Sequence, residues 1–440
     1  MNRLPAAVVN APATAGVLLA GFVLAACGGS PDAAPPMDAG AEGTPAPSGA
    51  PRAADENPLD IYIDKAGAYL ASTQAEDGSW PYFHSRKPDF AEPEPHANLF
   101  GTMITLMNLT HTGFEASSTF KRGADFVQGR MSKGFAWSLY EPGALGDASW
   151  FEPDADDTSV ALTVLAGRLR LAPVELKEVR ARFERHRTRD GLYLTYFDGF
   201  HPEKGFVPDP NVVSIGVNLN VLGFFGKYEL PRASLVQGLQ SLTQGERYWE
   251  KTPFYRSLPV LAYLASNAVE HGAPEAGELL RRFLADFAAG PGQDEEFASR
   301  LHTLDLAAFI KARAHACLLE LSPCRDLDLK VFQLAKRRQM DGSWETAPFY
   351  EYDTNPRALE AFLARRDFAV RRKRGGYGYD AERALASPGT VRYYDGSPAE
   401  TTSFALKALV FYRELLDRRP AMGPGPQGPS SPPRTSPAPS

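Results

Sequence analysis

Three aspartates, Asp154, Asp156 and Asp157, stand within four positions of one another in a stretch that reads Pro-Asp-Ala-Asp-Asp-Thr. An apolar run with helical spacing follows them directly and continues to about residue 167. Carboxylates crowded in this way repel one another, so at least one is expected to hold its proton well above the usual pKa of an aspartate. A protonated acid that faces a dry cavity could protonate an alkene or an epoxide.

The same stretch also fits a purely structural role. Asp154, followed three residues later by Asp157, can cap a helix, and acids near a helix N-terminus are stabilised by the helix dipole. A cap needs one or two acids, which leaves the third without a structural reason. At this point capping, proton donation and the binding of a ligand or cation all stay open.

The elements that must position these residues are predicted to be almost entirely helical. Apolar periodicity indicates helices near 60–73, 97–111, 117–132, 155–168, 173–187, 212–227, 232–244, 254–270, 274–289, 300–320, 327–339, 356–368 and 399–416. They alternate between helices that are apolar over most of their circumference and amphipathic, charged ones. Because a helix that is apolar nearly all round must be buried, we expect about six pairs, with inner helices forming a closed barrel inside outer ones.

Repeated sequences support this arrangement. The tetrapeptide Asp-Gly-Ser-Trp occurs at 77–80 and again at 341–344, after Gln74 and Gln339 respectively, and a weaker version ends at Trp137. The expected inner helices also begin alike, with polar residues ahead of the apolar run. If these helices all point the same way, their starts form a ring at one mouth of the barrel. Besides the aspartates, the candidate substrate-binding residues in this ring are His96, Asn211, Tyr255, Arg256, His302 and Glu400.

Taken together, the glutamine–tryptophan repeats, the helix pairing and the Asp-x-Asp-Asp-Thr motif resemble the terpenoid cyclase and protein prenyltransferase superfamily, and squalene–hopene cyclases in particular. The resemblance covers about residues 58–418. It implies an all-α fold, an (α/α)6 toroid, and a class II, proton-initiated cyclase without metal or cofactor. Asp156 would be the general acid, with Asp154 and Asp157 supporting it. Aromatic faces would stabilise the carbocation, in an apolar small-molecule site.

Two other classes of function remain open from the sequence. An (α/α) barrel also serves glycan hydrolases and lyases, which would use two separated carboxylates, such as Asp156 and Glu400, across an open groove. A non-catalytic binding or scaffold protein is the third class. A closed apolar pocket at Asp156 would favour the cyclase, and an open polar cleft would favour the glycan enzyme. A pocket filled by the protein's own side chains would favour the binding or scaffold protein.

The N-terminus resembles a bacterial lipoprotein signal. Arg3 precedes an apolar stretch at 15–26 that is too short to span a bilayer, and Leu-Ala-Ala before Cys27 resembles a lipobox. We therefore expect residues 1–26 to be removed and Cys27 to be acylated, although an ordinary signal peptide is the alternative. The protein would then be exported and anchored to a membrane, the outer membrane in a Gram-negative cell.

The composition also indicates where the folded domain begins and ends. Residues 27–57 and 419–440 are rich in Pro, Ala, Gly and Ser and are expected to be disordered, which leaves 58–418 as the toroid domain. A net charge of −6 does not indicate that the protein binds nucleic acid.

Cys317 and Cys324 are expected to form a disulfide in an exported protein. The alternative is a metal site formed by these two cysteines and His315.

Overall fold

The computed structural model describes residues 57–87, 89–95, 98–139, 153–197, 213–246, 248–251, 253–255, 257–290, 301–324, 327–354 and 391–418. These residues belong to one compact unit, Glu56–Ser440. Cys27, the expected helix at 356–368 and the expected disordered segments, apart from Asn57 at the start of α1, lie outside the described residues. The acylation of Cys27 therefore stays a prediction. Within the described ranges, none of the helices is both long enough and apolar enough to cross a membrane.

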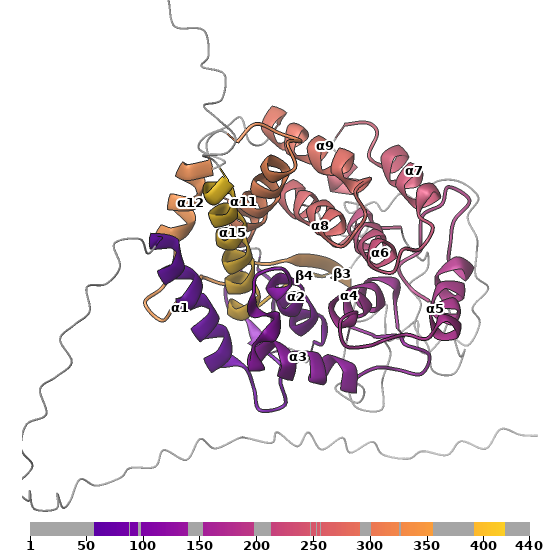
Figure 1. The fold of residues 1–440 in the computed structure, drawn as a ribbon, viewed down its shortest axis with the longest axis horizontal. Coiled ribbons are helices and arrows are strands. Elements are labelled where there is room, and N and C mark those ends of the chain that lie inside the picture. Colours follow the sequence, from indigo (N-terminus) through magenta and orange to yellow (C-terminus); the bar gives the residue numbers. More distant parts are fainter. Residues whose placement is uncertain are drawn as a thin grey trace, which may run out of the picture. The chain divides into compact units, whose positions relative to one another are not determined.

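Six helices form a closed inner ring. Each packs against the next one in the ring, and the last packs against the first (Figure 1). Their side chains are buried on nearly every side, which is why the sequence is apolar over most of each helix. The inner helices are α2 (Phe100–Leu109), α4 (Ala155–Leu165), α6 (Ile215–Lys227), α8 (Leu258–Glu270), α11 (Thr303–Leu318) and α15 (Pro398–Arg418).

Six outer helices surround this ring, and each buries one face against it (Figure 1). The outer helices are α1 (Pro58–Thr73), α3 (Ser118–Gly129), α5 (Pro173–Arg185), α7 (Ala233–Leu242), α9 (Ala276–Ala289) and α12 (Leu327–Lys336). The predicted all-α (α/α)6 toroid is confirmed.

A tryptophan repeat ties outer helix ends to inner helix starts. The indole N–H groups of Trp80, Trp137 and Trp344 each donate to a carbonyl near the end of an outer helix, at 2.7–2.8 Å. The backbone N–H of each tryptophan donates to a threonine hydroxyl near the start of an inner helix, at 3.1–3.2 Å. These threonines are Thr102, Thr158 and Thr402. The repeat found in the sequence is therefore a structural link between the two rings.

A small antiparallel sheet was not predicted. It has the strand order β2-β1-β4-β3, with β1 (Phe83–Ser85), β2 (Glu94–Pro95), β3 (Tyr350–Thr354) and β4 (Val391–Gly396). β2 leads into α2 and β4 leads into α15, so the sheet lies beside the starts of inner helices. Its strands are two to six residues long, and β1 pairs with β4 from the other end of the domain. Such short, non-local pairs leave little periodic signal in a sequence.

The predicted disulfide is wrong, because no bond joins Cys317 and Cys324. Cys317 belongs to the last turn of α11 and its side chain packs in the hydrophobic core. Cys324 lies in the segment after that helix and packs against the outside of the core. The short spacing suggested a bridge at a helix end, but the helical turn points the first thiol inward.

Candidate active site

The acidic cluster forms the first turn of α4. Asp154 is the N-cap residue, and its Oδ1 accepts a hydrogen bond from the backbone N–H of Asp157 at 2.8 Å. The structural role expected for Asp154 is therefore present. Asp156 and Asp157 lie in the turn that this cap stabilises, and all three side chains are at most 9% exposed. Capping accounts for Asp154 and leaves Asp156 to be explained.

Asp156 is held by side chains from the next two inner helices. Its Oδ2 accepts a hydrogen bond from the Tyr255 hydroxyl at 2.5 Å, and its Oδ1 accepts one from the Asn220 amide at 2.8 Å. Asn220 is on α6, and Tyr255 comes shortly before α8. The residue before this tyrosine, Phe254, has φ 71°, a conformation that costs energy for a bulky side chain. Local backbone strain therefore accompanies the placement of the Tyr255 phenol.

The surroundings favour the protonated form of Asp156. Burial, together with the nearby charge of Asp154, raises the pKa of Asp156 to about 7, against the lowering effect of the hydrogen bonds from Tyr255 and Asn220. Burial also raises the pKa of Asp154 to about 6 and holds that of Asp157 well above its usual range. The cluster therefore carries protons near neutral pH, mainly because it is buried and, for Asp156 and Asp157, also because neighbouring carboxyl groups repel one another.

A small pocket opens beside this carboxyl group. Its volume of about 50 Å³ is well below the ~300–1,000 Å³ of a typical small-molecule site. Five aromatic side chains contribute to its wall alongside the three aspartates. The lining residues are Phe100, Leu139, Asp154, Asp156, Asp157, Thr195, Tyr196, Phe254, Tyr255 and Tyr350. The pocket as it stands takes a small group next to Asp156.

A second pair of acids lies behind the same pocket wall. The hydroxyl of Tyr350 donates to Asp395 Oδ2 at 2.9 Å and accepts from the Asn98 amide at 3.0 Å. Burial raises the pKa of Asp395 to about 8, and burial together with the charge of Asp395 raises that of Glu400 well above its usual range. Tyr350 and Tyr255 both line the pocket, with ring centroids 6.4 Å apart, and each donates a hydrogen bond to a buried aspartate.

Only some of the substrate-binding residues predicted at the inner helix starts can be placed, and not all of those lie at the pocket. Tyr255 and Glu400 are buried at this mouth, and Tyr255 bonds the central aspartate. His302 is the N-cap residue of α11, with its side chain exposed and outside the pocket lining. The other predicted substrate-binding residues, His96, Asn211 and Arg256, lie outside the described residues.

Sequence reasoning missed three polar residues of this mouth as site residues. Asn220, Asp395 and Asn98 make hydrogen bonds there to partners far away in the sequence. Asn220 carries the clearest signal in retrospect, because an amide in the middle of an apolar inner helix requires a polar partner.

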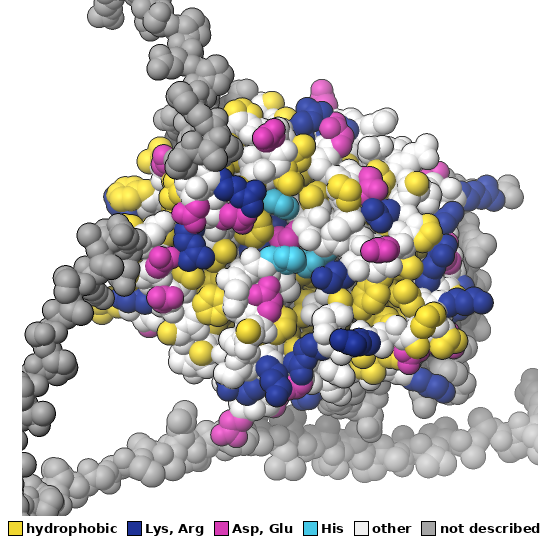
Figure 2. Space-filling view, in the orientation of Figure 1, with side chains coloured by type: hydrophobic (Ala, Val, Ile, Leu, Met, Phe, Trp, Pro, Cys, Tyr) yellow, Lys and Arg dark blue, Asp and Glu magenta, His cyan; other side chains and the backbone are white. Residues whose placement is uncertain are grey.

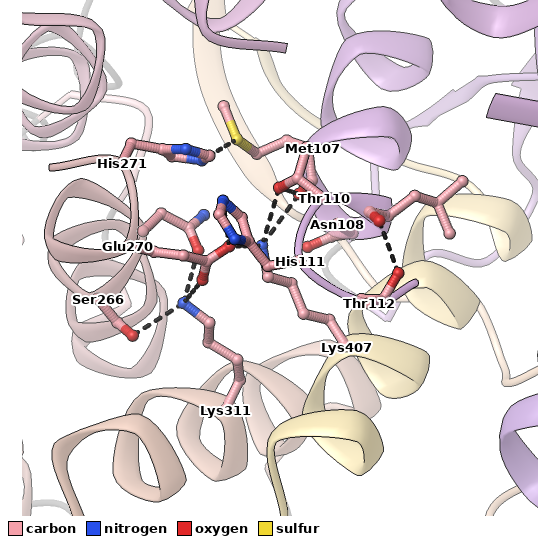
Figure 3. A network of polar contacts seen from close by, with 12 residues as sticks. Met107, Asn108, Thr110, His111, Thr112, Ser266, Glu270, His271, Lys311 and Lys407 are labelled. Carbon is pink, nitrogen blue, oxygen red and sulfur yellow. Dashed lines mark hydrogen bonds and ion pairs between the residues drawn. The ribbon is translucent and has the colours of Figure 1, made fainter. Parts of the chain in front are cut away.

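The opposite mouth holds a different set of charges (Figure 3). The carboxylate of Glu270, at the end of α8, lies 2.8 Å from the ammonium group of Lys311 and 2.7 Å from that of Lys407. Glu270, His111 and His271 also bring potential metal-ligating atoms within 4.8 Å of one another. Two ammonium groups already bind the carboxylate and repel a further cation, so this cluster is better explained as a structural ion network.

Histidine and acidic side chains also reach the surface near the middle of the face seen in Figure 2. Among the described residues, the ligand atoms of Cys317, Cys324 and His315 do not gather into a possible metal site.

The fold is shared with solved structures, although the sequence is distant. No protein-family model matches the chain, and no curated protein matches it. The apo structure of the type II terpene cyclase MstE from Scytonema is 13% identical, with a TM-score of 0.51, and the match covers 81% of this chain and 98% of that one. A variant of MstE in complex with its substrate, geranylgeranyl dihydroxybenzoate, is 16% identical, with a TM-score of 0.50 and the same coverage.

A possible GH105-family protein from Salmonella enterica is 13% identical, with a TM-score of 0.46, and covers 82% of this chain and 94% of that one. At 13–16% identity, the similarity to MstE supports the fold alone and leaves the activity to be argued from the site.

Proposed function

We propose that this protein is a class II cyclase-type enzyme in which Asp156 donates the initiating proton to a carbon–carbon double bond. The observation that carries the proposal is the setting of Asp156. It is a buried carboxyl group with a raised pKa, it accepts hydrogen bonds from Tyr255 and Asn220, and it lines an aromatic pocket. General acids are most effective when their pKa lies near the working pH.

The chemistry follows from these contacts. The π electrons of the alkene take the proton of Asp156 and form a C–H bond, which leaves a tertiary carbocation on the neighbouring carbon. The negative charge moves to the Asp156 carboxylate, where the hydrogen bonds from Tyr255 and Asn220 stabilise it. The faces of the aromatic rings in the pocket wall attract the positive charge. Attack by a second double bond then closes a ring, and loss of a proton ends the reaction.

The size of the pocket limits how a substrate would bind. A volume of about 50 Å³ has room beside Asp156 only for the reacting end of a substrate chain. A larger part of the substrate would fit only if the residues around the pocket moved. This size is also the observation that favours the non-catalytic binding or scaffold protein. The glycan-acting alternative gains less support, because Glu400 is completely buried and does not face Asp156 across an open groove.

The test is a reaction in heavy water. The purified protein would be incubated with geranylgeranyl dihydroxybenzoate, which is the substrate of the structurally similar MstE. The product would then be analysed for ring formation and for deuterium content by mass spectrometry and NMR. Wild type should incorporate one deuterium per cyclised molecule, and Asp156→Asn should lower the rate at least 100-fold, because general acid catalysis contributes about 10²–10⁴-fold.

Glu278→Gln, at an exposed ion pair on α9, is the matched control and should leave the rate unchanged. Cyclisation that persists in Asp156→Asn would refute the role of Asp156. Absence of any cyclised product from wild type with this and shorter prenyl arenes would favour the non-catalytic alternative.

A further inference from the structure

Large apolar side chains are exposed on one outer helix. On α12, Leu329 and Phe332 are 59% and 54% exposed. They are three positions apart, so they share one face of the helix. The opposite face of α12 packs into the domain through Leu327, Val331 and Leu334. The outer helix therefore has two apolar faces, of which the core covers only one.

The start of α1 extends this apolar surface. Ile61 on α1 is 50% exposed, and α1 and α12 are neighbours in Figure 1. Consecutive residues of α15 hold the two helices. Arg413 donates to Asp60 at 2.6 Å, and Tyr412 donates to Asp328 at 2.5 Å. Because each of these acids is followed directly by an exposed apolar residue, the two apolar side chains belong to the same part of the surface.

The turn after α12 completes the surface. Met340 in this turn is 96% exposed. The turn packs against α1 so closely that a Cβ atom on Gly342 would lie 2.5 Å from the carbonyl oxygen of Lys65. We call the four exposed residues Ile61, Leu329, Phe332 and Met340 the α1–α12 patch. Among the described residues, the other exposed large apolar side chains are Val174 on α5 and Leu319 after α11. Four of six thus gather in one sector of the outer wall.

Basic residues accompany the patch. Lys330 and Lys336 lie on α12. The two arginines that follow are partly buried, and Arg337 donates to the backbone carbonyl of Leu301 at 2.6 Å, so the lysines are the cations that flank the patch. The ammonium group of Lys336 lies 4.4 Å from the ring centroid of Phe332. Long basic side chains of this kind cover apolar surface with their methylene groups and reach outward with their charges. Apolar side chains flanked by cations match an anionic lipid surface, which offers headgroup phosphates above an apolar layer.

The chain also enters the domain at this sector. Cys27, the predicted acylation site, precedes Pro58 by about 30 residues, and an extended chain spans roughly 3.3–3.6 Å per residue. A domain tethered within about 100 Å of a bilayer has a high effective concentration there, so a modest docking surface is sufficient.

We propose that the α1–α12 patch docks on an anionic lipid bilayer, with Leu329 and Phe332 entering the interfacial layer. The toroid is then held against the membrane by its own surface as well as by the predicted acyl group. This proposal is independent of the chemistry assigned to Asp156.

The experiment measures the binding of the domain to vesicles without any acyl group. All described helices and strands belong to the compact unit Glu56–Ser440 and form one closed core, so this unit is used alone. Its partition onto vesicles of phosphatidylethanolamine with one third phosphatidylglycerol is measured by sedimentation. The double variant Leu329→Ser, Phe332→Ser should bind at least tenfold more weakly than the parent. Val174→Ser, which removes an apolar residue of equal exposure on α5, should bind like the parent.

Circular dichroism melting checks that all variants stay folded, as expected for exposed positions. The proposal is overturned if the parent does not bind these vesicles, or if the double variant binds as tightly as the parent. It is also overturned if analytical ultracentrifugation shows that the parent dimerises through the patch and the double variant does not, since a second copy would then be the occupant. Equal loss of binding in Val174→Ser would show that binding is not specific to the patch.

Discussion

At the scale of single residues, Asp156 differs from the two aspartates around it in what holds it. Asp154 is fixed within its own helical turn, whereas Asp156 is fixed by the amide of Asn220 on α6 and by the phenol of Tyr255 in the segment before α8. Burial keeps its proton on, and the two donors prepare the carboxylate that forms when the proton leaves. These contacts are not part of the helix cap, which Asp154 already provides.

The raised pKa of Asp156 has a defined consequence for stability. Its pKa is about 7 in the folded state and about 3.9 in an unfolded chain, so between these values the native state binds more protons. Stability contributed by this proton is present at low pH and is lost as the pH rises through 7. Asp156→Asn cannot ionise, so its stability relative to wild type should increase from pH 5 to pH 8 by about 1.4 kcal/mol for each pKa unit crossed.

Urea unfolding at both pH values measures this difference. Asp341→Asn is the control, because hydrogen bonds from Ser343 lower the pKa of Asp341 and it should show no gain at pH 8. A difference between Asp156→Asn and wild type that is the same at pH 5 and pH 8 would contradict the raised pKa.

At the scale of elements, the start of α4 combines a helix cap, a tryptophan link and the acid. Its N-cap side chain bonds the backbone of the first turn, and Thr158 in that turn bonds the backbone of Trp137. The direction of the first turn therefore depends on groups within the helix and on the preceding outer helix. Both set the position of Asp156.

Removal of the cap should therefore loosen this turn. Asp154→Ala should lower the free energy of unfolding by about 1 kcal/mol, because an unsatisfied N–H group is left at the helix start. Asp154→Ser keeps an acceptor at the same place and should recover most of the loss. Chemical denaturation at pH 5, where the neighbouring acids hold their protons, makes the comparison. If both variants lose equal stability, the cap is not the reason for Asp154.

At the scale of the whole toroid, the two mouths hold buried polar groups of different kinds. The buried acids with raised pKa values lie where inner helices start, and the ion network of Glu270, Lys311 and Lys407 lies toward the ends of α2 and α8. The two lysines lie toward the C-terminal mouth, where the dipoles of the inner helices favour positive charge. The network also joins α8, α11, α15 and α2, since Lys407 donates to the carbonyl of Met107 at 3.0 Å.

Breaking this network should destabilise the ring strongly. Glu270→Gln removes the one carboxylate that two buried lysines share, so the free energy of unfolding should fall by about 3–5 kcal/mol. Burial already lowers the pKa of Lys311 to about 7, so Lys311 should lose its proton more readily in this variant. Glu278→Gln removes a surface ion pair on α9 and should change it by less than about 1 kcal/mol. Denaturant unfolding of the two variants is the measurement. A similar, small effect of both would show that the network contributes little to ring closure.

Most of the fold could be predicted from the sequence because its signals are local. Helical periodicity separates inner from outer helices, and a closed ring is the arrangement that buries the former and exposes one face of the latter. The predicted alternation, the tryptophan repeat and the cap at Asp154 all depend on residues within a few turns of one another. These features are confirmed by the structure.

What the sequence did not determine depends on distant partners. Three hydrogen bonds of the site join residues that are 45 to 99 positions apart: Tyr255 to Asp156, Asn220 to Asp156, and Tyr350 to Asp395. Strands β1 and β4 of the small sheet are still farther apart in the sequence. No local pattern encodes such pairs, and only the closing of the ring brings them together. The predicted disulfide is wrong because closeness in the sequence did not bring the two cysteines together. Their places in the fold keep Cys317 and Cys324 from forming a bond. The sequence thus determined that Asp156 stands at a helix start, and the tertiary structure decided that this start is buried, proton-holding and open to a pocket.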